Sequence, residues 1–455
     1  MLFVHSRGLA RAHLVLLFTL MGTAAAGQTA QPASSQPPIS LPELLARVAR
    51  EYPRIAASNA RIVAAAGARR AAGVLPNPVV SIGIENARLP GHEPAAGVDH
   101  ETMATATLPL EFLFQRGARV RRAEAELAAS RADAFAERQR IALEAARAYY
   151  RVATAQIELA TAQDLLRWLD SLVAYNRARA QEGAAAEADL VRTELERDRA
   201  AIELTMRRAD LVQARTSLRT FCGDSAGVNL AVMTPDFALS LSMFDAGREH
   251  GSDTSHGRPE VEAARARVVA TGAGISVARS MLVREVGAMA GLKWSAGTTT
   301  LLAGLSLPLP LVDQNRGELA RAKAERDAAA LELTAVEQEA RAALAGATET
   351  AALLLERVRD LAGPKDSVAG PTVRHLTRAD EIRLIALGAY QEGAVPLFQV
   401  LDAARAWGES RTGYYRTLYA QHESVLLVML AQGQDLLNAM SATPGKTVPR
   451  DEASR

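Results

Sequence analysis

Residues 307–325 read LPLPLVDQNRGELARAKAE, and they restate the pattern of residues 108–126, LPLEFLFQRGARVRRAEAE. Both stretches begin with Leu-Pro-Leu, pass through Gln and Arg-Gly, and end in Ala-x-Ala-Glu, and both are 19 residues long. They lie about 200 residues apart. A pattern of this length that occurs twice indicates that the chain contains two copies of one larger unit, longer than the repeats of solenoid proteins.

Two further pairs of stretches support the duplication. YPRIAASNARIV at 52–63 matches RPEVEAARARVV at 258–269, with an offset of 206 residues. QEGAAAEADL at 181–190 matches QEGAVPLFQV at 391–400, with an offset of 210 residues. The conserved order predicts four successive segments: a first structural repeat at 41–222, an inter-repeat linker at 223–257, a second structural repeat at 258–433 and a flexible tail at 434–455.

The N-terminal segment has the layout of a secretory signal peptide. Two arginines precede a short apolar run, and the small-residue stretch GTAAAGQTA follows. The apolar run is too short to span a bilayer as a helix. We therefore expect a signal peptide over 1–26, with a buried N-terminal helix as the alternative. The stretch PASSQPP then predicts a disordered linker over 27–40.

Composition argues against some classes of protein and favours others. The 52 basic residues are balanced by 51 acidic residues, which argues against a nucleic-acid-binding protein. Aromatic residues are only 4% of the chain, and long stretches contain neither Pro nor Gly, so we expect long helices packed through small side chains. The only cysteine, Cys222, cannot form an intramolecular disulfide, and we expect it to be a small buried apolar residue.

Each predicted repeat contains two short runs in which apolar residues alternate with polar or small residues. In the first run, VVSIGIEN at 79–86, the residues Val80, Ile82 and Ile84 fall on one face of a strand. The other three runs lie at 102–110, 286–293 and 301–307. Such strands fit a transmembrane β-barrel, and they also fit two half-buried hairpins of a soluble domain. Four strands cannot close a barrel, so a membrane location requires several chains to share their strands.

A heptad seam predicts a very long helix in the first repeat. Apolar positions recur at alternating steps of four and three residues: Ile141, Ala145, Ala148, Val152, Ala155, Leu159, Ala162, Leu166, Leu169 and Val173. The surrounding stretch 116–182 contains no proline, and as one helix it would be about 100 Å long. Gly183 is the natural stop of this helix, and a return helix follows. We expect the second repeat to take the same course, with its turn at Gly393 and Pro396 at the start of its return helix.

The order of these features resembles the TolC family of outer-membrane efflux channels. The resemblance covers 41–433 and rests on the doubled Leu-Pro-Leu…Arg-Gly pattern, the two glycine-led turns and LPNPVVSIGIEN at 75–86, which is most similar to the heavy-metal (cobalt-zinc-cadmium) branch. It implies a mainly α fold with transmembrane β: a trimeric α/β-barrel in which each chain gives four strands to a shared 12-stranded barrel and its helices to a long periplasmic tube. The Leu-Pro-Leu would leave the strand and Arg-Gly would form the turn, so the strand–helix joins are expected at Pro109, Gly117, Pro308 and Gly317.

The resemblance also implies a function and partners. The chain would be the outer-membrane duct of a tripartite efflux system and would passively export metal cations or, alternatively, drugs. Its partners would be two further copies of the chain in a homotrimer, outer-membrane lipid, a periplasmic adaptor protein and an inner-membrane RND-type transporter.

Residues at the periplasmic tips are candidate functional residues under this resemblance. Family channels are closed there by charged side chains: Asp402 matches one of two tip aspartates, Gln399 replaces the other, and Asp189 occupies a similar place in the first tip. The residues expected to contact the adaptor are Gly183, Gly393, Pro396, Leu397 and Phe398.

The sequence predicts no enzyme, no cofactor and no metal centre, because it contains no G-x-S-x-G, P-loop or C-x-x-C pattern. His92, Glu93, Asp99 and His100 could bind a metal weakly at an outer mouth, but a solvated loop is the simpler interpretation. Two other classes stay open. A periplasmic adaptor would have one helical hairpin between two halves of a Gly-rich β-domain, and a structural coiled-coil protein would not explain the alternating strands.

Overall fold

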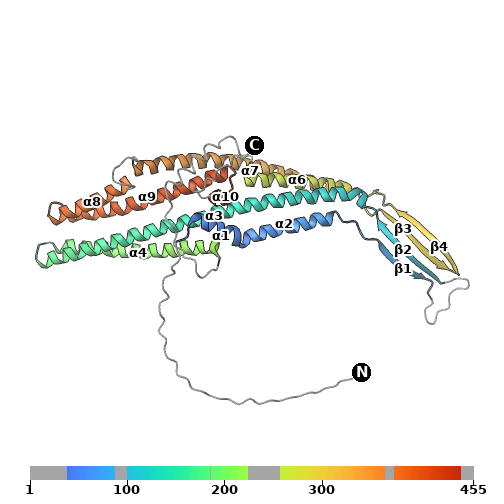
Figure 1. Cartoon of the computed structure of the whole chain (residues 1–455), viewed down its shortest axis with the longest axis horizontal. Coiled ribbons are helices and arrows are strands. Elements are labelled where there is room, and N and C mark those ends of the chain that lie inside the picture. The colour runs from blue at the N-terminus through green and yellow to red at the C-terminus, as the bar shows by residue number, and fades with distance from the viewer. Residues whose placement is uncertain (1–37, 88–99, 185, 224–256, 364–372, 442–455) are drawn as a thin grey trace, which may run out of the picture.

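The computed structural model describes residues 38–87, 100–184, 186–223, 257–363 and 373–441. The chain is strongly elongated: long helices run side by side, and a four-stranded sheet projects from one end of them (Figure 1). The predicted signal peptide, residues 1–26, lies outside the described residues, as does most of the predicted linker between the repeats.

The sheet contains one hairpin from each repeat. β1 (Val79–Glu85), β2 (Glu101–Pro109), β3 (Gly287–Ser295) and β4 (Thr298–Ser306) lie antiparallel in the order β1-β2-β3-β4. The four predicted strands are confirmed, with ends that agree within three residues. Ala296 and Gly297 connect β3 to β4 with φ values of 50° and 77°, the left-handed pair that a two-residue hairpin turn requires.

In the first repeat one helix runs the whole distance from the sheet to the far tip. α1 (Leu41–Glu51) and α2 (Pro53–Ala72) precede β1, α3 (Phe112–Gln181) leaves the sheet after β2, and α4 (Glu187–Cys222) returns. α3 has 70 residues, which corresponds to about 105 Å. It begins four residues before the predicted start of the long helix.

The second repeat follows the same order with one interruption. α6 (Pro259–Ser280) precedes β3, α7 (Arg316–Ala362) and α8 (Arg374–Gln391) run toward the tip, and α9 (Leu397–Ala431) returns. The expectation of one long outgoing helix in this repeat is therefore wrong. α7 ends before Gly363, whose φ of 82° lies in the left-handed region, and a proline follows that glycine in the sequence.

The predicted seam of α3 is buried. Eight of its ten positions are buried, and only Leu159 and Leu166 are half-buried. α3 packs against α2 and α6 on the side of the sheet, and against α4 and α9 toward the tip. Alanines along the seam let these helices approach closely, so the seam fixes where the other helices lie.

The hydrophobic core is thickest midway along the molecule, where α1 and α10 (Leu436–Ser441) cover α3. Leu44 and Val48 of α1 are fully buried there, next to Tyr149 of α3. Ile39 is also buried, so the last residues of the predicted linker 27–40 belong to the fold.

Gln139 of α3 holds the start of α10 in place. Its Nε2 donates to Asp435 Oδ1 at 2.7 Å, and its Oε1 accepts from the backbone N–H of Leu436 at 2.9 Å. The tail predicted to be flexible from 434 onward therefore begins with a packed helix. The Gln139 amide accepts a hydrogen bond from a backbone N–H at the start of that helix, which would otherwise lack a partner in the core. The remainder of that tail, 442–455, lies outside the described residues.

Replacing both Ala148 and Ala155 with Leu should destabilise the helical bundle. The two side chains are 5% and 7% exposed, so larger groups must push neighbouring helices away from α3, at a cost of about 1–3 kcal/mol per site. Thermal unfolding of the purified double variant should show a lower midpoint than the parent protein. The same change at Ala335 and Ala343, which are exposed on α7, is the control. An equal loss in both variants would place the critical seam elsewhere.

Candidate functional site

The sheet has one continuous apolar face. Residues paired across neighbouring strands share a face, and the register aligns Ile82 with Ala104, Ala104 with Leu292, and Leu292 with Leu301. The same face carries Val80, Ile84, Ala106, Leu108, Ala288, Ala290, Trp294, Ala303 and Leu305, with Thr102 and Thr299 as its polar members near the far end. The alternation predicted for each separate strand thus merges into one surface.

This apolar face is uncovered in the single chain. Ile82 is 74% exposed and Leu301 is 76% exposed, and an apolar surface of this extent marks a site of contact with a membrane or a partner. Strands of nine residues span about 30 Å, which is close to the thickness of the hydrocarbon core of a bilayer. Trp294 lies at the end of the sheet far from the helices, where membrane barrels carry aromatic residues.

The opposite face of the sheet is polar or small. Most of its residues fit this description, among them Ser81, Gly83, Thr105, Thr107 and Gly291, and its larger apolar side chains are Val79, Met103, Met289 and Leu302. At its far end Glu101 forms an ion pair with Lys293, and Ser295 Oγ donates to Glu101 Oε1 at 2.9 Å. A sheet that is apolar on one face and hydrophilic on the other separates lipid from water when it is closed into a barrel.

The joins between strands and helices are built differently from the expectation. Pro109 is the last residue of β2, and Pro308 follows β4, as strand ends tolerate proline. Gly117 does not form the turn, because α3 already begins five residues earlier. Gly317 is likewise the second residue of α7, and the turn before it is made by Asn315, which has a φ of 53°.

The two far tips have the same backbone turn. Gly183 has a φ of 70°, its N–H donates to the carbonyl of Ala180, and the N–H of Ala184 donates to the carbonyl of Arg179. In the second tip Gly393 has a φ of 76°, and equivalent hydrogen bonds link residues 393 and 394 to residues 390 and 389. This pair of bonds is the Schellman motif, which requires a left-handed residue and therefore favours glycine. The repeated QEG thus specifies the turn that reverses each hairpin.

Leu397 is part of a small core at the tip rather than an exposed contact residue. It is 4% exposed and packs with Leu169, Leu172, Val400 and Leu401. The expectation that Leu397 is free to contact a partner is therefore wrong, because helical periodicity turns it toward α3. Pro396, the N-cap of α9, is exposed, and the neighbouring Phe398 is 53% exposed.

Two of the three candidate gate residues, Gln399 and Asp402, are exposed at the tip, and the third, Asp189, is half-buried. Gln399 and Asp402 are three residues apart on α9, so both project from one face of that helix, and both are exposed. Arg405 does not pair with Asp402; it forms an ion pair with Glu196 of α4 at 2.6 Å. Asp189 differs from Asp402 because it lies in the first turn of α4, where the helix dipole stabilises a negative charge.

A buried polar network joins the two helical hairpins, α3–α4 and α8–α9, near the tip. Asn176 of α3 donates to Thr193 Oγ1 of α4 at 2.9 Å, and its Oδ1 accepts from the hydroxyl of Tyr390 on α8 at 2.8 Å. Burial and the nearby charge of Asp189 raise the pKa of the Tyr390 hydroxyl, so it remains a donor at neutral pH. Nothing in the heptad pattern distinguishes these residues, and the sequence analysis missed them.

A second interhelical link, also missed, is centred on Glu158 of α3. This carboxylate is 8% exposed and pairs with Arg207 of α4 at 2.8 Å and with Arg416 of α9 at 2.5 Å. A buried charge with two partners holds the first hairpin against the return helix of the second repeat. Glu158 precedes seam residue Leu159, and this adjacency to the seam was the only sequence signal of its position.

The remaining candidate groups have simpler roles. His92, Glu93 and Asp99 lie outside the described residues, and the ring of His100 contacts Thr102 Oγ1 at 3.2 Å. Within the described part of the chain no three His, Cys, Asp or Glu side chains are arranged to hold a metal ion. Cys222 is buried as expected, and burial raises the pKa of its thiol. Among the described helices none has a stretch that is long and apolar enough to cross a membrane.

Removing the Glu158 carboxylate should weaken the link between the hairpins. Glu158→Ala removes the shared partner of Arg207 and Arg416, and we expect a loss of about 2 kcal/mol in the free energy of unfolding, since the hydrogen bonds to a charged group are lost while both arginines stay accessible to water. Glu203→Ala is the matched control, because Glu203 pairs with the same Arg207 but is 51% exposed, and it should cost less than about 1 kcal/mol. Denaturant unfolding of both variants measures the difference, and similar losses would show that the buried link has no special role.

Comparison with known proteins gives a family match for part of the chain and a fold match for most of it. The family model described as outer membrane efflux protein matches residues 44–224. The comparison with curated proteins gives no match. Among solved structures, CusC, studied for transmembrane channel formation, is 16% identical with a TM-score of 0.69, and the match covers 87% of this chain and 92% of CusC.

Two further solved structures come from named bacteria. The CmeC outer membrane channel of Campylobacter jejuni is 13% identical with a TM-score of 0.71, and the match covers 88% of this chain and 89% of CmeC. The open state of the MtrE outer membrane channel of Neisseria gonorrhoeae is 16% identical with a TM-score of 0.67, and the match covers 87% of this chain and 89% of MtrE. The chain therefore has the TolC-like fold of outer-membrane channels, and residues 44–224 match the outer membrane efflux protein family.

Proposed function

We propose that this chain is one protomer of a homotrimeric outer-membrane efflux channel, a passive duct of a tripartite export system. The observation that carries the proposal is the sheet: an exposed apolar face and an opposite polar face lie at one end of a helical body about 100 Å long. The sheet spans the outer membrane, and the helices extend into the periplasm.

The open edges of the sheet support an oligomer. Neither β1 nor β4 has a second neighbouring strand among the described residues, and backbone groups at such edges are not tolerated in lipid. Three chains supply twelve strands, which close the barrel. Exposed apolar side chains on α4 and α8, such as Ile202, Met206 and Ile385, then pack between protomers in the tube.

The far tips are the proposed contact with a periplasmic adaptor and an RND-type inner-membrane transporter. Phe398 supports this assignment, since a half-exposed aromatic ring beside a tight turn is suited to enter a groove on a partner. The Schellman turns at Gly183 and Gly393 present short, well-ordered ends. Leu397 contributes indirectly by packing the tip from inside.

Asp402 is the proposed charge of the periplasmic gate, with one copy from each protomer around the axis. Its carboxylate is exposed and forms no ion pair within the described part of the chain, so no intramolecular partner explains it. Gln399 is neutral, and the constriction therefore carries three carboxylates rather than six. A ring of this kind attracts cations and disfavours anions.

Metal cations are the proposed cargo, and drugs are the alternative. The support is the LPNP at 75–78 before the first strand, which carries the resemblance to the heavy-metal branch. A strain lacking the chain should become sensitive to divalent metals if this branch is right, and to hydrophobic drugs if the alternative is right. Growth with each class of compound separates the two.

The proposal as a whole has a direct test in the isolation of outer membranes. The protein should be extracted from them as a trimer that resists SDS, and it should form conducting pores in planar bilayers. A protein recovered as a water-soluble monomer from the periplasm would contradict the channel and favour an adaptor or a structural coiled-coil protein.

Arginine on the apolar face of the sheet should impair insertion. Ile82→Arg places a charge among lipid chains, at a cost of about 2–4 kcal/mol near the middle of a bilayer. Ser81→Arg is the matched control, because residue 81 projects from the polar face of the same strand. The yield of assembled trimer in outer membranes should fall for the first variant only. Equal yields would argue against lipid contact.

Removing the Asp402 carboxylate should reduce the preference of the pore for cations. In planar bilayers under a salt gradient, the reversal potential of Asp402→Ala should move toward zero, because the three carboxylates of the constriction are lost. Asp189→Ala is the control, since Asp189 has a structural place at the helix start. A change in Asp189→Ala with none in Asp402→Ala would move the constriction to the first tip.

A further inference from the structure

Positive charge accumulates where the helices meet the sheet. Four stretches form this join: 69–78, 110–122, 279–286 and 307–321. Together they contain ten arginines and four acidic residues, a net charge of +6, whereas the whole chain has a net charge of +1. The arginines, here called the basic collar, are Arg69, Arg70, Arg116, Arg119, Arg121, Arg122, Arg279, Arg284, Arg316 and Arg321.

The opposite end of the molecule has no such excess. The stretches 175–197 and 374–405 surround the two tips and contain eight basic and nine acidic residues, not counting His375. The charge of the basic collar is therefore a property of the join and not of the long helices in general.

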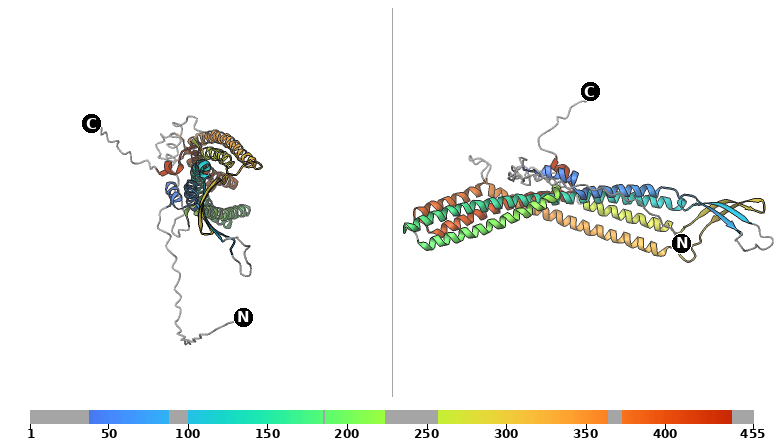
Figure 2. Two further views of the ribbon diagram at one scale, coloured as in Figure 1. Left: turned by 90° about the vertical axis from the view of Figure 1, so that its right-hand side faces the viewer. Right: turned by 90° about the horizontal axis from the view of Figure 1, so that it is seen from below.

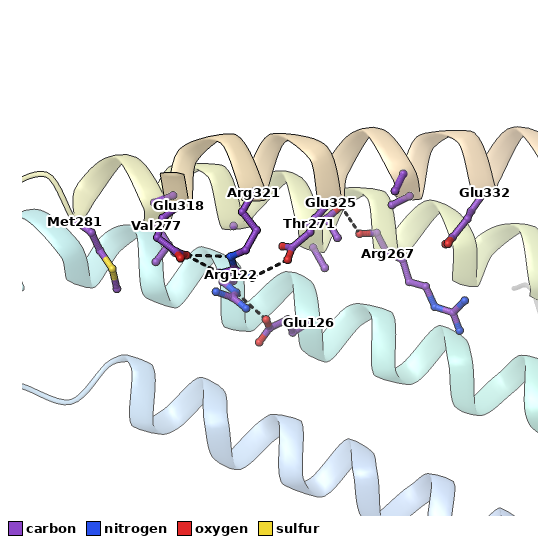
Figure 3. Close-up of a pocket in the computed structure, with 16 residues that line it drawn as sticks. Arg122, Glu126, Arg267, Thr271, Val277, Met281, Glu318, Arg321, Glu325 and Glu332 are labelled. Atoms are coloured by element: carbon purple, nitrogen blue, oxygen red, sulfur yellow. Dashed lines mark hydrogen bonds and ion pairs between the residues drawn. The ribbon is translucent and has the colours of Figure 1, made fainter. Parts of the chain in front are cut away.

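Four arginines of the collar form ion pairs, and a fifth, Arg116, donates through Nε to the carbonyl of Gly73 at 2.8 Å. Arg69 pairs with Glu124 at 2.7 Å, and Arg284 lies 3.6 Å from Asp313. The other two line a groove of about 500 Å³ between α3, α6 and α7, which Figure 3 shows. Arg122 pairs there with Glu126, and Arg321 pairs with two glutamates. Folding accounts for these four charges.

The other six arginines have no ion pair within the described part of the chain: Arg70, Arg116, Arg119, Arg121, Arg279 and Arg316. Arg70 and Arg279 lie in the last turns of α2 and α6, where the helix dipole favours a positive charge. Arg316 is the first residue of α7, where the dipole disfavours it. Helix stability therefore does not explain Arg316, and a ligand outside the chain would.

An apolar ridge leads from the sheet to this place. After β4 the alternation of leucines continues in the sequence LSLPLPL at 305–311, which ends in a tight turn where the N–H of Leu311 donates to the carbonyl of Leu309 at 2.8 Å. Its leucines are 56–79% exposed: Leu305, Leu307, Leu309 and Leu311. Val312, the next residue, is 98% exposed. The apolar face of the sheet thus extends beyond the last strand to within four residues of Arg316.

We infer that the basic collar binds the phosphate groups of anionic phospholipids in the membrane leaflet nearest the helices. The inference rests on the proposed membrane location of the sheet. Leucines of the ridge would lie among acyl chains, and the arginines would then lie at the depth of the headgroups. A guanidinium group forms paired hydrogen bonds with phosphate oxygens, which suits arginine better than lysine at such a site. The collar contains no lysine.

The test compares two triple variants of the full-length trimer. Arg70→Gln, Arg121→Gln and Arg316→Gln remove three collar charges whose side chains make no hydrogen bond or ion pair in the described structure. Arg192→Gln, Arg208→Gln and Arg378→Gln remove three equally exposed charges from α4 and α8, away from the sheet. The trimers are placed in vesicles of phosphatidylcholine alone or mixed with phosphatidylglycerol. The lipids that each trimer retains on purification are then measured.

Wild-type trimers should retain phosphatidylglycerol in preference to phosphatidylcholine. The preference should fall by about fivefold for each charge removed in the collar variant, and it should weaken as salt is raised. The control variant with changes in α4 and α8 should keep the wild-type preference for phosphatidylglycerol. Equal retention of both lipids by the wild-type trimer would overturn the inference without any variant. An equal loss of the phosphatidylglycerol preference in the collar variant and the control variant would also overturn the inference.

Two further outcomes remain separate from these. If the collar variant loses its trimer while wild-type lipid retention shows no preference, the arginines pair with acidic groups of a neighbouring protomer, and the lipid inference is wrong. Pore conductance of wild-type protein in vesicles of phosphatidylcholine alone tests the proposed channel. Conductance in phosphatidylcholine vesicles without any lipid preference would support the channel and contradict lipid binding by the basic collar. Failure of the protein to insert into either kind of vesicle would contradict both proposals.

Discussion

The close packing of one helix is the constraint on which the whole molecule depends. α3 touches α1, α2, α4, α6, α9 and α10, and the small residues of its seam set how near those helices come. A helix of 70 residues cannot be held straight by local propensity in water, so its buried stripe supplies the stability. The sheet at one end and the tip turns at the other are both positioned by this single element (Figure 2).

The duplication explains why the strand pair, the tip turn and the return helix each occur twice in one chain, although only the first repeat has an unbroken outgoing helix. Each repeat gives one hairpin to the sheet and one reversing turn to the tip, and the two hairpins meet where β2 pairs with β3. Most apolar strand residues of both repeats fall on the same face, because the pairing of β2 with β3 aligns the apolar positions of one strand with those of the other. A shift of one residue in that pairing would place Leu292 with the polar residues and break the face.

The sequence was sufficient where a short-range rule determines the structure. Alternation placed the strands and their faces, heptad spacing placed the α3 seam, and Gly183 and Gly393 marked turns that need a left-handed residue. It was insufficient where an outcome depends on neighbouring elements. Leu397 follows a turn and appeared exposed, but its burial depends on α3, which is distant in sequence.

Other differences have the same cause. Gly117 was expected in a turn because it follows the strand in the doubled Leu-Pro-Leu…Arg-Gly pattern, yet it lies within a helix that begins at Phe112. The break after Gly363 is visible in the sequence, but the similarity of the two repeats suggested continuity there. The ion pairs of Glu158 join three helices, and beyond the position of Glu158 next to the seam the sequence gives no sign of its partners.

The interruption between α7 and α8 makes the two tips of one protomer mechanically unequal. The α3–α4 turn is connected to the sheet by a single helix, because α3 is unbroken from the tip to the sheet. The α8–α9 turn lies between two shorter helices. α8 has 18 residues, and α9 ends at Ala431, midway along the molecule. The first tip is thus joined to the sheet by one continuous helix, whereas the second reaches it through the packing of α9 on α7 and α3 and through the buried links of Tyr390 and Arg416 to α3.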